Sequence, residues 1–307
     1  MKLNFWISLP LSMICLMAQA NTTTTASTTT TTVATTAPAA ATTATASTDA
    51  AATSTTAAPK KEEAPTLKYG VSYEAGYSMQ AQQQPDGSRS QSISHSFTPS
   101  LSYGEYRSSV SFSYEQDLID SSTNGFADPV FAASKKAWTL GQYLKLGPSA
   151  TLVLPMTDAS KNKTGLMYNI GGALSLSLNT KNLGMEALSA SYQVAVSKTF
   201  TNYDTNSAGN PQTSHKLRNR ISLGYQITDV VSFFNMFDFN SSYSVNGVVT
   251  NSFFSLQSFG YSINDNVNVS LAHSNGGAYL KTGTYEKNLK FFDSENSSYS
   301  VALEVSL

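Results

Sequence analysis

The stretch LKYGVSYEAGYSM, residues 67–79, alternates apolar side chains with small or polar ones. A repeat of two residues is the period of a β-strand that has one apolar face and one polar face. The alternation continues for longer than the roughly 9 to 11 residues that a membrane-spanning strand needs. The apolar face carries Leu67, Tyr69, Val71, Tyr73, Tyr77 and Met79, and the opposite face carries Lys68, Gly70, Ser72, Glu74, Gly76 and Ser78.

The same alternation recurs along the rest of the chain and predicts further strands. It is clear in residues 93–103, 109–114, 166–178, 188–197 and 216–227, and weaker in 128–146, 150–155, 231–239, 252–263, 267–273 and 297–307. Together these segments predict an all-β fold, an antiparallel up-and-down transmembrane β-barrel with about twelve strands, within a range of about ten to fourteen.

The predicted connections fall into two classes that alternate along the chain. Short ones are expected at 104–105, 147–149, 180–184, 228–229 and 264–266, and long polar ones at 83–91, 117–127, 155–164, 201–214, 240–250 and 274–296. An up-and-down bacterial barrel has this order, with tight turns at the periplasmic end and longer loops outside.

The composition favours a membrane setting without helices. Charged residues make up 13% of the chain, about half the usual share of a soluble domain. No stretch beyond the N-terminus reaches the roughly 18 apolar residues of a transmembrane helix. The net charge of −1 gives no global electrostatic reason for binding nucleic acid, and one cysteine with three histidines offers little for a metal site.

Three segments with different compositions divide the chain. Residues 1–20 combine Lys2, an apolar stretch and the small residues around Ala20, the layout of a cleaved secretory signal. Residues 21–66 are mostly Thr and Ala, too poor in apolar bulk to fold, so a disordered linker is expected. It could act as a passive tail, a stalk or a tether to peptidoglycan or another periplasmic partner. Residues 67–307 form the predicted barrel.

The C-terminus alternates apolar and polar residues up to the last position. It resembles the terminal strand that Gram-negative outer-membrane β-barrel proteins present to the barrel-assembly machinery. The resemblance implies the outer membrane as location and that machinery as a partner. The implied assembly signal consists of Tyr299, Val301, Leu303, Val305 and Leu307, and Leu307 departs from the aromatic last residue that the family prefers.

Charged residues on the polar face of the strands are candidates for lining a pore. Lys216, Arg218 and Arg220 alternate on one predicted strand, so they should project together into the lumen and could select anions. The competing interpretation is charge balance inside the barrel. If the 228–230 turn sets the register, Arg220 faces Asp238 on the next strand, and further inward acids are Glu74, Glu115 and Glu304.

Two short motifs resemble other barrel families. The segment 273–276, His-Ser-Asn-Gly, resembles the His-x-Ser-Asn-Gly motif of outer-membrane phospholipases, which implies lipid hydrolysis. However, His273 and Ser274 are adjacent and should point to opposite faces of a strand, which disfavours them as base and nucleophile. The segment 125–129, with 154–155 and 160–161, resembles porin-like barrels grouped as transporters of aromatic compounds.

The leading hypothesis is a porin-like channel for passive uptake of small solutes, because the inward face is small, polar and charged. No catalytic, cofactor or metal residues are assigned, and the expected partners are outer-membrane lipid, the assembly machinery and the solutes, without nucleic acid. One alternative is a structural or surface-interaction barrel in which segment 274–296 or the linker carries the function. A phospholipase-like hydrolase is a further alternative.

Overall fold

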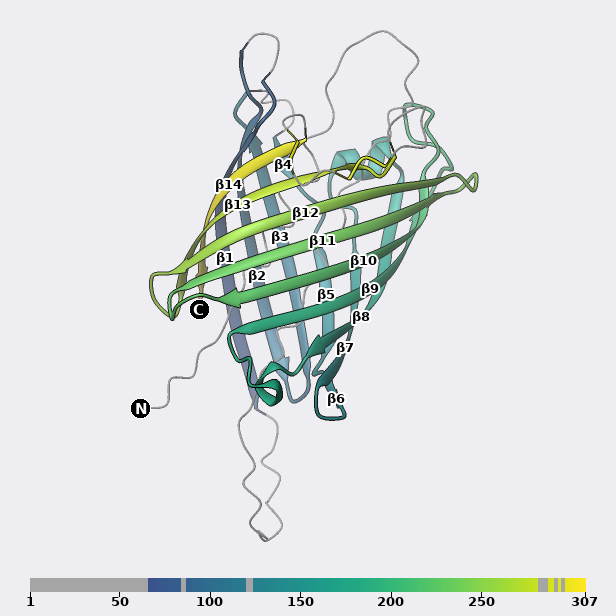
Figure 1. Cartoon of the computed structure of the whole chain (residues 1–307). Coiled ribbons are helices and arrows are strands. Elements are labelled where there is room, and N and C mark those ends of the chain that lie inside the picture. The colour runs from purple at the N-terminus through teal and green to yellow at the C-terminus, as the bar shows by residue number, and fades with distance from the viewer. Residues whose placement is uncertain (1–65, 84–86, 120–123, 281–286, 290–291, 294–295) are drawn as a thin grey trace.

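The computed structural model describes residues 66–83, 87–119, 124–280, 287–289, 292–293 and 296–307 (Figure 1). Within them, fourteen strands form one antiparallel sheet, and because β4 (Gly125–Phe126) and β6 (Trp138–Leu140) are short appendages, the remaining twelve form the wall of a barrel. The wall strands are β1 (Leu67–Gln80), β2 (Gln91–Tyr103), β3 (Tyr106–Asp117), β5 (Val130–Lys135), β7 (Leu144–Val153), β8 (Leu166–Leu178), β9 (Leu188–Thr201), β10 (Thr213–Gln226), β11 (Val231–Ser244), β12 (Val249–Ser262), β13 (Val267–Ala278) and β14 (Ser297–Ser306).

The sheet closes on itself where the last strand meets the first. β14 pairs with β1 from Ser72 opposite Ser306 to Gln80 opposite Ser298. Next to the Ser72–Ser306 pair, Val71 and Leu307 exchange two backbone hydrogen bonds of 3.0 and 2.8 Å. Closure removes the sheet edges, so the backbone groups along the wall find hydrogen-bond partners without water. The predicted barrel with about twelve strands is confirmed.

The connections sort to opposite ends of the barrel (Figure 1). The turn end contains the connections of β2–β3, β5–β7, β8–β9, β10–β11 and β12–β13, together with Leu307. The loop end contains the β7–β8 connection, with a π-helix at Ala159–Lys163, and the β9–β10 and β13–β14 connections. No helix among the described residues is long and apolar enough to cross a membrane.

The prediction of one strand at 128–146 followed by a turn at 147–149 is wrong. The chain turns at 141–143 instead, after β6, and Gly147 and Pro148 lie inside β7, opposite Ser175 and Leu174 of β8. On the other side of β7, the pairing with β5 stops at Ser149 and the pairing with β6 starts at Leu146. Pro148 therefore falls in a gap between two partners, where its missing N–H interrupts no hydrogen bonding on that side.

Two predicted long loops are shorter than expected because Ser and Asn residues continue the strands. β11 extends to Ser244 and β12 starts at Val249, so segment 240–250 is mostly strand joined by a tight turn. Gly247 in this turn has a φ of +79°, a left-handed conformation that favours glycine. Similarly, β13 continues to Ala278, so the predicted loop at 274–296 begins later. Small hydroxyl side chains fit the barrel interior, and their polarity does not indicate a loop.

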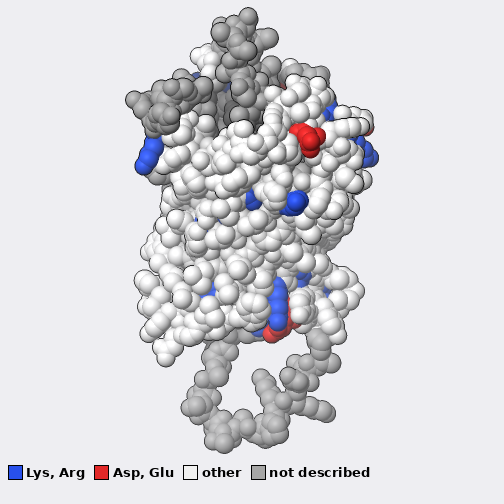
Figure 2. All heavy atoms as spheres, turned by 90° about the vertical axis from the view of Figure 1, so that its right-hand side faces the viewer, with Lys and Arg blue, Asp and Glu red and all other residues white. Residues whose placement is uncertain are grey.

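The outer surface of the wall is apolar, as the alternation predicts. Outward residues such as Tyr69, Ile221, Leu223 and Leu271 are between 48% and 76% exposed. Figure 2 shows one face of the molecule, where a few charged side chains lie on a mostly uncharged surface. A broad apolar exterior is the surface that lipid covers in outer-membrane barrels.

The inner surface is not lined by Ser and Gly alone. Met236, Leu256, Ala272 and Ala302, from four consecutive strands β11 to β14, pack into one buried cluster. We call these four residues the apolar band. Phe234 and Phe254 pack against it. The interior therefore combines polar walls with an apolar strip.

The predicted signal segment 1–20 and nearly all of the predicted linker 21–66 lie outside the described residues. Both assignments stay predictions, and β1 starts at Leu67, where the alternating pattern starts. Tyr299, Val301, Leu303 and Val305 lie on β14, and Leu307 follows it.

Candidate functional site

The charged side chains of β10 lie on the inner face of the barrel. Arg218 and Arg220 are 5% and 3% exposed, whereas their neighbours Ile221 and Leu223 are 52% and 48% exposed on the outer face. Lys216 has the same parity as the two arginines and is partly buried. One strand thus brings three cations into the interior, as the two-residue repeat predicted.

Arg220 is neutralised by a carboxylate on the next strand. It lies directly opposite Asp238 of β11, the register expected from the turn at 228–230. Its Nε and Nη2 atoms donate to the two Asp238 carboxylate oxygens, each over 2.6 Å. Both residues are 3% exposed, so the pair is bidentate and shielded from water. Internal charge pairing therefore accounts for this arginine.

Arg218 has polar neighbours but no carboxylate partner. Its Nη2 donates to Gln193 Oε1 over 2.9 Å, and Gln193 Nε2 donates to Ser175 Oγ over 2.9 Å. Its buried Nε finds no hydrogen-bond partner within the described part of the chain, and neither does Oδ1 of Asn240, which lies directly opposite on β11. The guanidinium therefore keeps an unused donor inside the barrel.

Lys216 is the second uncompensated cation. Its cross-strand neighbours are Ser242 on β11 and Ser197 on β9. Among the described residues, the ion pairs are Lys135 with Glu105 and Arg220 with Asp238, so neither Lys216 nor Arg218 belongs to one. Burying a charge without a counter-charge is costly, and an anionic solute would reduce that cost.

The predicted inward acids gather on the other side of the barrel. Glu74 of β1 and Glu304 of β14 are directly opposite each other in the strand pairing. Glu74 is 3% exposed, and Glu304 Oε2 is buried without a partner in the described structure. Glu115 lies opposite Ser94 of β2 on the same inner face. All three acids therefore lie on the inner face, as the alternation predicted.

Sequence reasoning missed Gln193 and Asn240, the polar neighbours of Arg218. Gln193 lies on a predicted strand with inward parity, whereas Asn240 falls in the predicted loop at 240–250, which the structure shows to be part of β11. Their contact with Arg218 depends on the registers of β9 and β11 against β10, which the Ser-rich sequences specify weakly.

His273 and Ser274 point to opposite faces of β13, as their adjacency predicted. Ser274 is 2% exposed and its Oγ lies 2.9 Å from Ser298 Oγ. The His273 ring instead contacts Gln257 Oε1 through Nδ1 at 2.7 Å and Ser297 Oγ through Nε2 at 3.0 Å. Phe292 from the β13–β14 connection stacks on this ring at 4.7 Å between centroids.

The scattered segments that resemble transporters of aromatic compounds meet in space. The Asp128 carboxylate accepts hydrogen bonds from the backbone N–H groups of Met156 and Thr157 over 2.9 and 3.0 Å. It also accepts a hydrogen bond from the side-chain hydroxyl of Ser160. Pro129, which follows it, is fully buried. The Asp-Pro pair therefore ties the segment before β5 to the β7–β8 connection, which is a structural role at the loop end.

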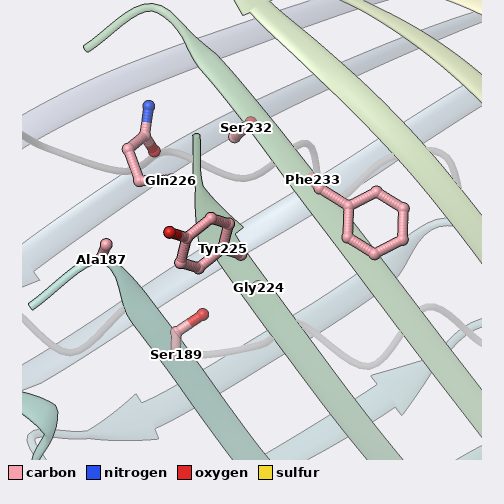
Figure 3. Close-up of a pocket in the computed structure, with 7 residues that line it drawn as sticks. All are labelled: Ala187, Ser189, Gly224, Tyr225, Gln226, Ser232 and Phe233. Atoms are coloured by element: carbon pink, nitrogen blue, oxygen red, sulfur yellow. The ribbon is translucent and has the colours of Figure 1, made fainter. Parts of the chain in front are cut away.

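Figure 3 shows a shallow pocket at the turn end of β9, β10 and β11. It is lined by Ala187, Ser189, Gly224, Tyr225, Gln226, Ser232 and Phe233. None of these side chains is charged, and within the described residues no three His, Cys, Asp or Glu side chains are grouped so that they could hold a metal ion. The interior charges are therefore the candidate site.

No protein-family model and no curated protein matches the chain. Solved structures share its fold at low identity. An outer-membrane channel from Pseudomonas putida F1 matches with a TM-score of 0.51 and 11% identity, over 82% of this chain and 100% of that one. The NanC porin matches with a TM-score of 0.50 and 12% identity, over 77% of this chain and 100% of that one. The chain therefore has the barrel fold of outer-membrane porins and channels.

Proposed function

We propose that the chain is a porin-like channel of the outer membrane that takes up small solutes passively. The observation that carries this proposal is the inner face of β10, where Arg218 and Lys216 have no carboxylate partner among the described residues. A barrel that only needed stability would be expected to pair or omit such charges, because uncompensated buried charge destabilises a fold. A hydrated channel for polar solutes uses them.

The outer membrane as location is supported by the exterior of the wall. Exposed apolar side chains on nearly every strand suit lipid, and the alternating C-terminal segment 299–307 suits recognition by the barrel-assembly machinery. The predicted signal at 1–20 would direct export. The shared fold of the two outer-membrane neighbours supports the same location.

Osmotic swelling of liposomes tests uptake directly. The protein is produced from the full chain in a Gram-negative host, extracted from its outer membrane and reconstituted. We expect swelling with small polar solutes and a rate that falls with solute size. Liposomes that stay unresponsive, although the protein in them shows the heat-dependent gel shift of a folded barrel, would contradict the channel.

A structural or surface-interaction barrel is the second candidate, and one observation favours it. Phe292 stacks on His273, and Asn288 donates a backbone hydrogen bond of 2.7 Å to Tyr279, so described parts of the β13–β14 connection lie against the wall. Deleting residues 281–295 tests this candidate. Loss of envelope integrity while swelling persists would favour it over the channel.

A hydrolase is poorly supported by the geometry. Ser297, His273 and Gln257 lie in the order of a nucleophile, a base and an orienting group. However, Ser297 is 4% exposed, and its Oγ accepts a backbone hydrogen bond from Asp293 over 3.1 Å. An ester carbonyl has no approach to this hydroxyl. Unchanged phospholipid hydrolysis in Ser274→Ala and Ser297→Ala variants would match this interpretation.

A further inference from the structure

Two lysines lie on the outer surface of the wall. Among the Asp, Glu, Lys and Arg residues of the twelve wall strands, Lys135 of β5 and Lys198 of β9 have outward parity, and the others point inward. Lys135 is the last residue of β5, at the turn end, and Lys198 lies three residues before the loop end of β9. A lysine that faces lipid is costly at the middle of a membrane and tolerated near its surfaces, so the two positions mark opposite surfaces.

Lys135 is neutralised by the protein itself. Its Nζ lies 3.4 Å from Glu105 Oε2. The same Nζ lies 5.8 Å from the centroid of the Tyr106 ring and 5.3 Å from that of the Trp138 ring. This lysine therefore has a carboxylate and two aromatic partners within the wall and needs no partner from the membrane.

Lys198 has no such counter-charge. It is exposed, and neither ion pair of the described residues includes it. Its Nζ lies 5.3 Å from the centroid of the Phe200 ring, which stacks on Tyr168 with 4.4 Å between centroids. Its cross-strand neighbours are Ile170 on β8 and His215 on β10, the strands on either side of β9 in Figure 1. The cation therefore stands among apolar, aromatic and imidazole groups without an acid.

His215 offers a second hydrogen-bond donor beside Lys198. Both side chains are exposed, and residues directly opposite each other in an antiparallel pair have Cβ atoms about 5 Å apart. His215 Nδ1 lies 2.9 Å from Ser214 Oγ. A serine hydroxyl that donates to Nδ1 leaves the ring proton on Nε2, which can then donate to another group. Two donors on neighbouring strands suit an anion that has several acceptor oxygens, such as a phosphate.

The level of Lys198 fits the head groups of a lipid leaflet. Three residues of a strand tilted by about 45° correspond to about 7 Å along the membrane normal, so Lys198 lies about that far below the loop-side end of β9. The four-carbon stem of a lysine lets its ammonium group reach toward the surface from this depth. The Tyr168 and Phe200 rings beside it belong to the residue types that favour the head-group zone.

We propose that Lys198 and His215 form a site on the outer wall for the phosphate of an anionic lipid in the leaflet at the loop end. Ile170 and Val196, the outward neighbours of Lys198, are 50% and 53% exposed, so acyl chains cover the wall directly beneath the site. A lipid brings its phosphate and its chains to these two surfaces together. The inference relies on the membrane location proposed above and is independent of conduction.

Local lipid composition beside Lys198 tests the proposal. Ile170→Trp places a fluorescent reporter directly opposite Lys198, and Trp6→Phe with Trp138→Phe removes the chain's own two tryptophans. The protein is produced from the full chain and reconstituted in mixed vesicles of phosphatidylcholine and phosphatidylglycerol, of which one or the other has brominated, quenching acyl chains. We expect phosphatidylglycerol to be favoured beside the reporter by about fivefold at low salt, and by less at 1 M salt.

Single variants assign the preference to the site. Lys198→Gln should bring the ratio of the two lipids to about one, Lys198→Arg should preserve the preference, and His215→Gln should lower it partly. Lys135→Gln is the matched control at the opposite end of the wall and should leave the ratio unchanged. The heat-dependent gel shift verifies that each variant is folded. If Ile170→Trp fails to fold, Val196→Trp serves as the reporter, because Val196 lies two residues from Lys198 on the same face.

The outcomes separate this inference from the channel function. Equal quenching by the two lipids overturns the site, and so does a preference that survives Lys198→Gln or that Lys135→Gln removes to the same extent. A ratio that His215→Gln leaves unchanged overturns the two-donor site. Protein that does not enter vesicles contradicts the membrane location and the inference together, whereas vesicles that show the lipid preference without swelling contradict the channel alone.

Discussion

At the scale of single residues, the interior of the barrel contains both satisfied and unsatisfied charge. Arg220 and Asp238 form a bidentate pair, whereas Arg218, two residues away, donates to the Gln193 side chain and has no carboxylate partner among the described residues. Neighbouring positions of one strand therefore serve different purposes. The Arg220–Asp238 pair stabilises the fold, and in our proposal Arg218 remains available to a solute.

The buried pair gives a prediction on stability. Asp238→Asn leaves the Arg220 guanidinium buried without its counter-charge, and breaking such a pair costs about 3–5 kcal/mol. We expect the free energy of unfolding in urea to fall by about that amount. Asp229→Asn, in the exposed turn between β10 and β11, is the control and should change it by less than about 0.5 kcal/mol. Equal effects of the two variants would mean that the pair contributes nothing specific.

His273 supports a prediction on the β13–β14 connection. His273→Ala removes the contacts to Gln257, Ser297 and Phe292, so the connection should leave the wall more often. Trypsin should then cleave after Lys287 several-fold faster, because proteolysis follows local opening. Cleavage after Lys161 and Lys163 in the β7–β8 connection should stay constant and serves as the internal control. An unchanged rate at Lys287 would show that His273 does not hold the connection.

At the scale of strands, most of the barrel could be predicted from the two-residue repeat. β1, β2, β8, β9 and β10 lie where their alternation placed them. The errors occur where composition conceals the repeat. Gly147 and Pro148 resemble a turn, but they lie in a gap between β5 and β6.

The gap in the partner of β7 leads to a prediction on proline. Pro148→Ala should leave folding unchanged, because no partner strand pairs with this position on the side of β5 and β6. Thr151→Pro should strongly reduce the folded fraction, since Thr151 pairs with Ala132 on one side and Gly171 on the other. The heat-dependent shift of the folded barrel on a gel reports both results. Similar folded fractions for the two variants would contradict this register.

The interior site was harder to predict than the strands. The inward side of Arg218 follows from parity alone, but its contact with Gln193 requires the register of two strands whose Ser-rich faces specify it weakly. Likewise, Ser297 reaches His273 from a strand that follows a long connection. Contacts between distant segments need the folded barrel, and local patterns do not contain them.

At the scale of the whole molecule, an apolar exterior surrounds a partly charged interior in a closed twelve-stranded wall. Closure allows strands with one polar face to lie in lipid without exposing backbone groups. The fold is that of outer-membrane porins and channels, at 11% and 12% identity. In our proposal this wall encloses a channel, and the inward charges of β10 decide which solutes pass.

Single-channel recording in a planar bilayer tests the channel most directly. The protein is compared with a variant lacking residues 21–66 and with a triple variant, Lys216→Gln, Arg218→Gln and Arg220→Gln, across a salt gradient. We predict steady conductance from the unmodified protein and a reversal potential that shifts toward cation preference in the triple variant. Folded protein that conducts no current with or without residues 21–66, or a reversal potential that the triple variant leaves unchanged, would contradict a channel governed by its interior charges.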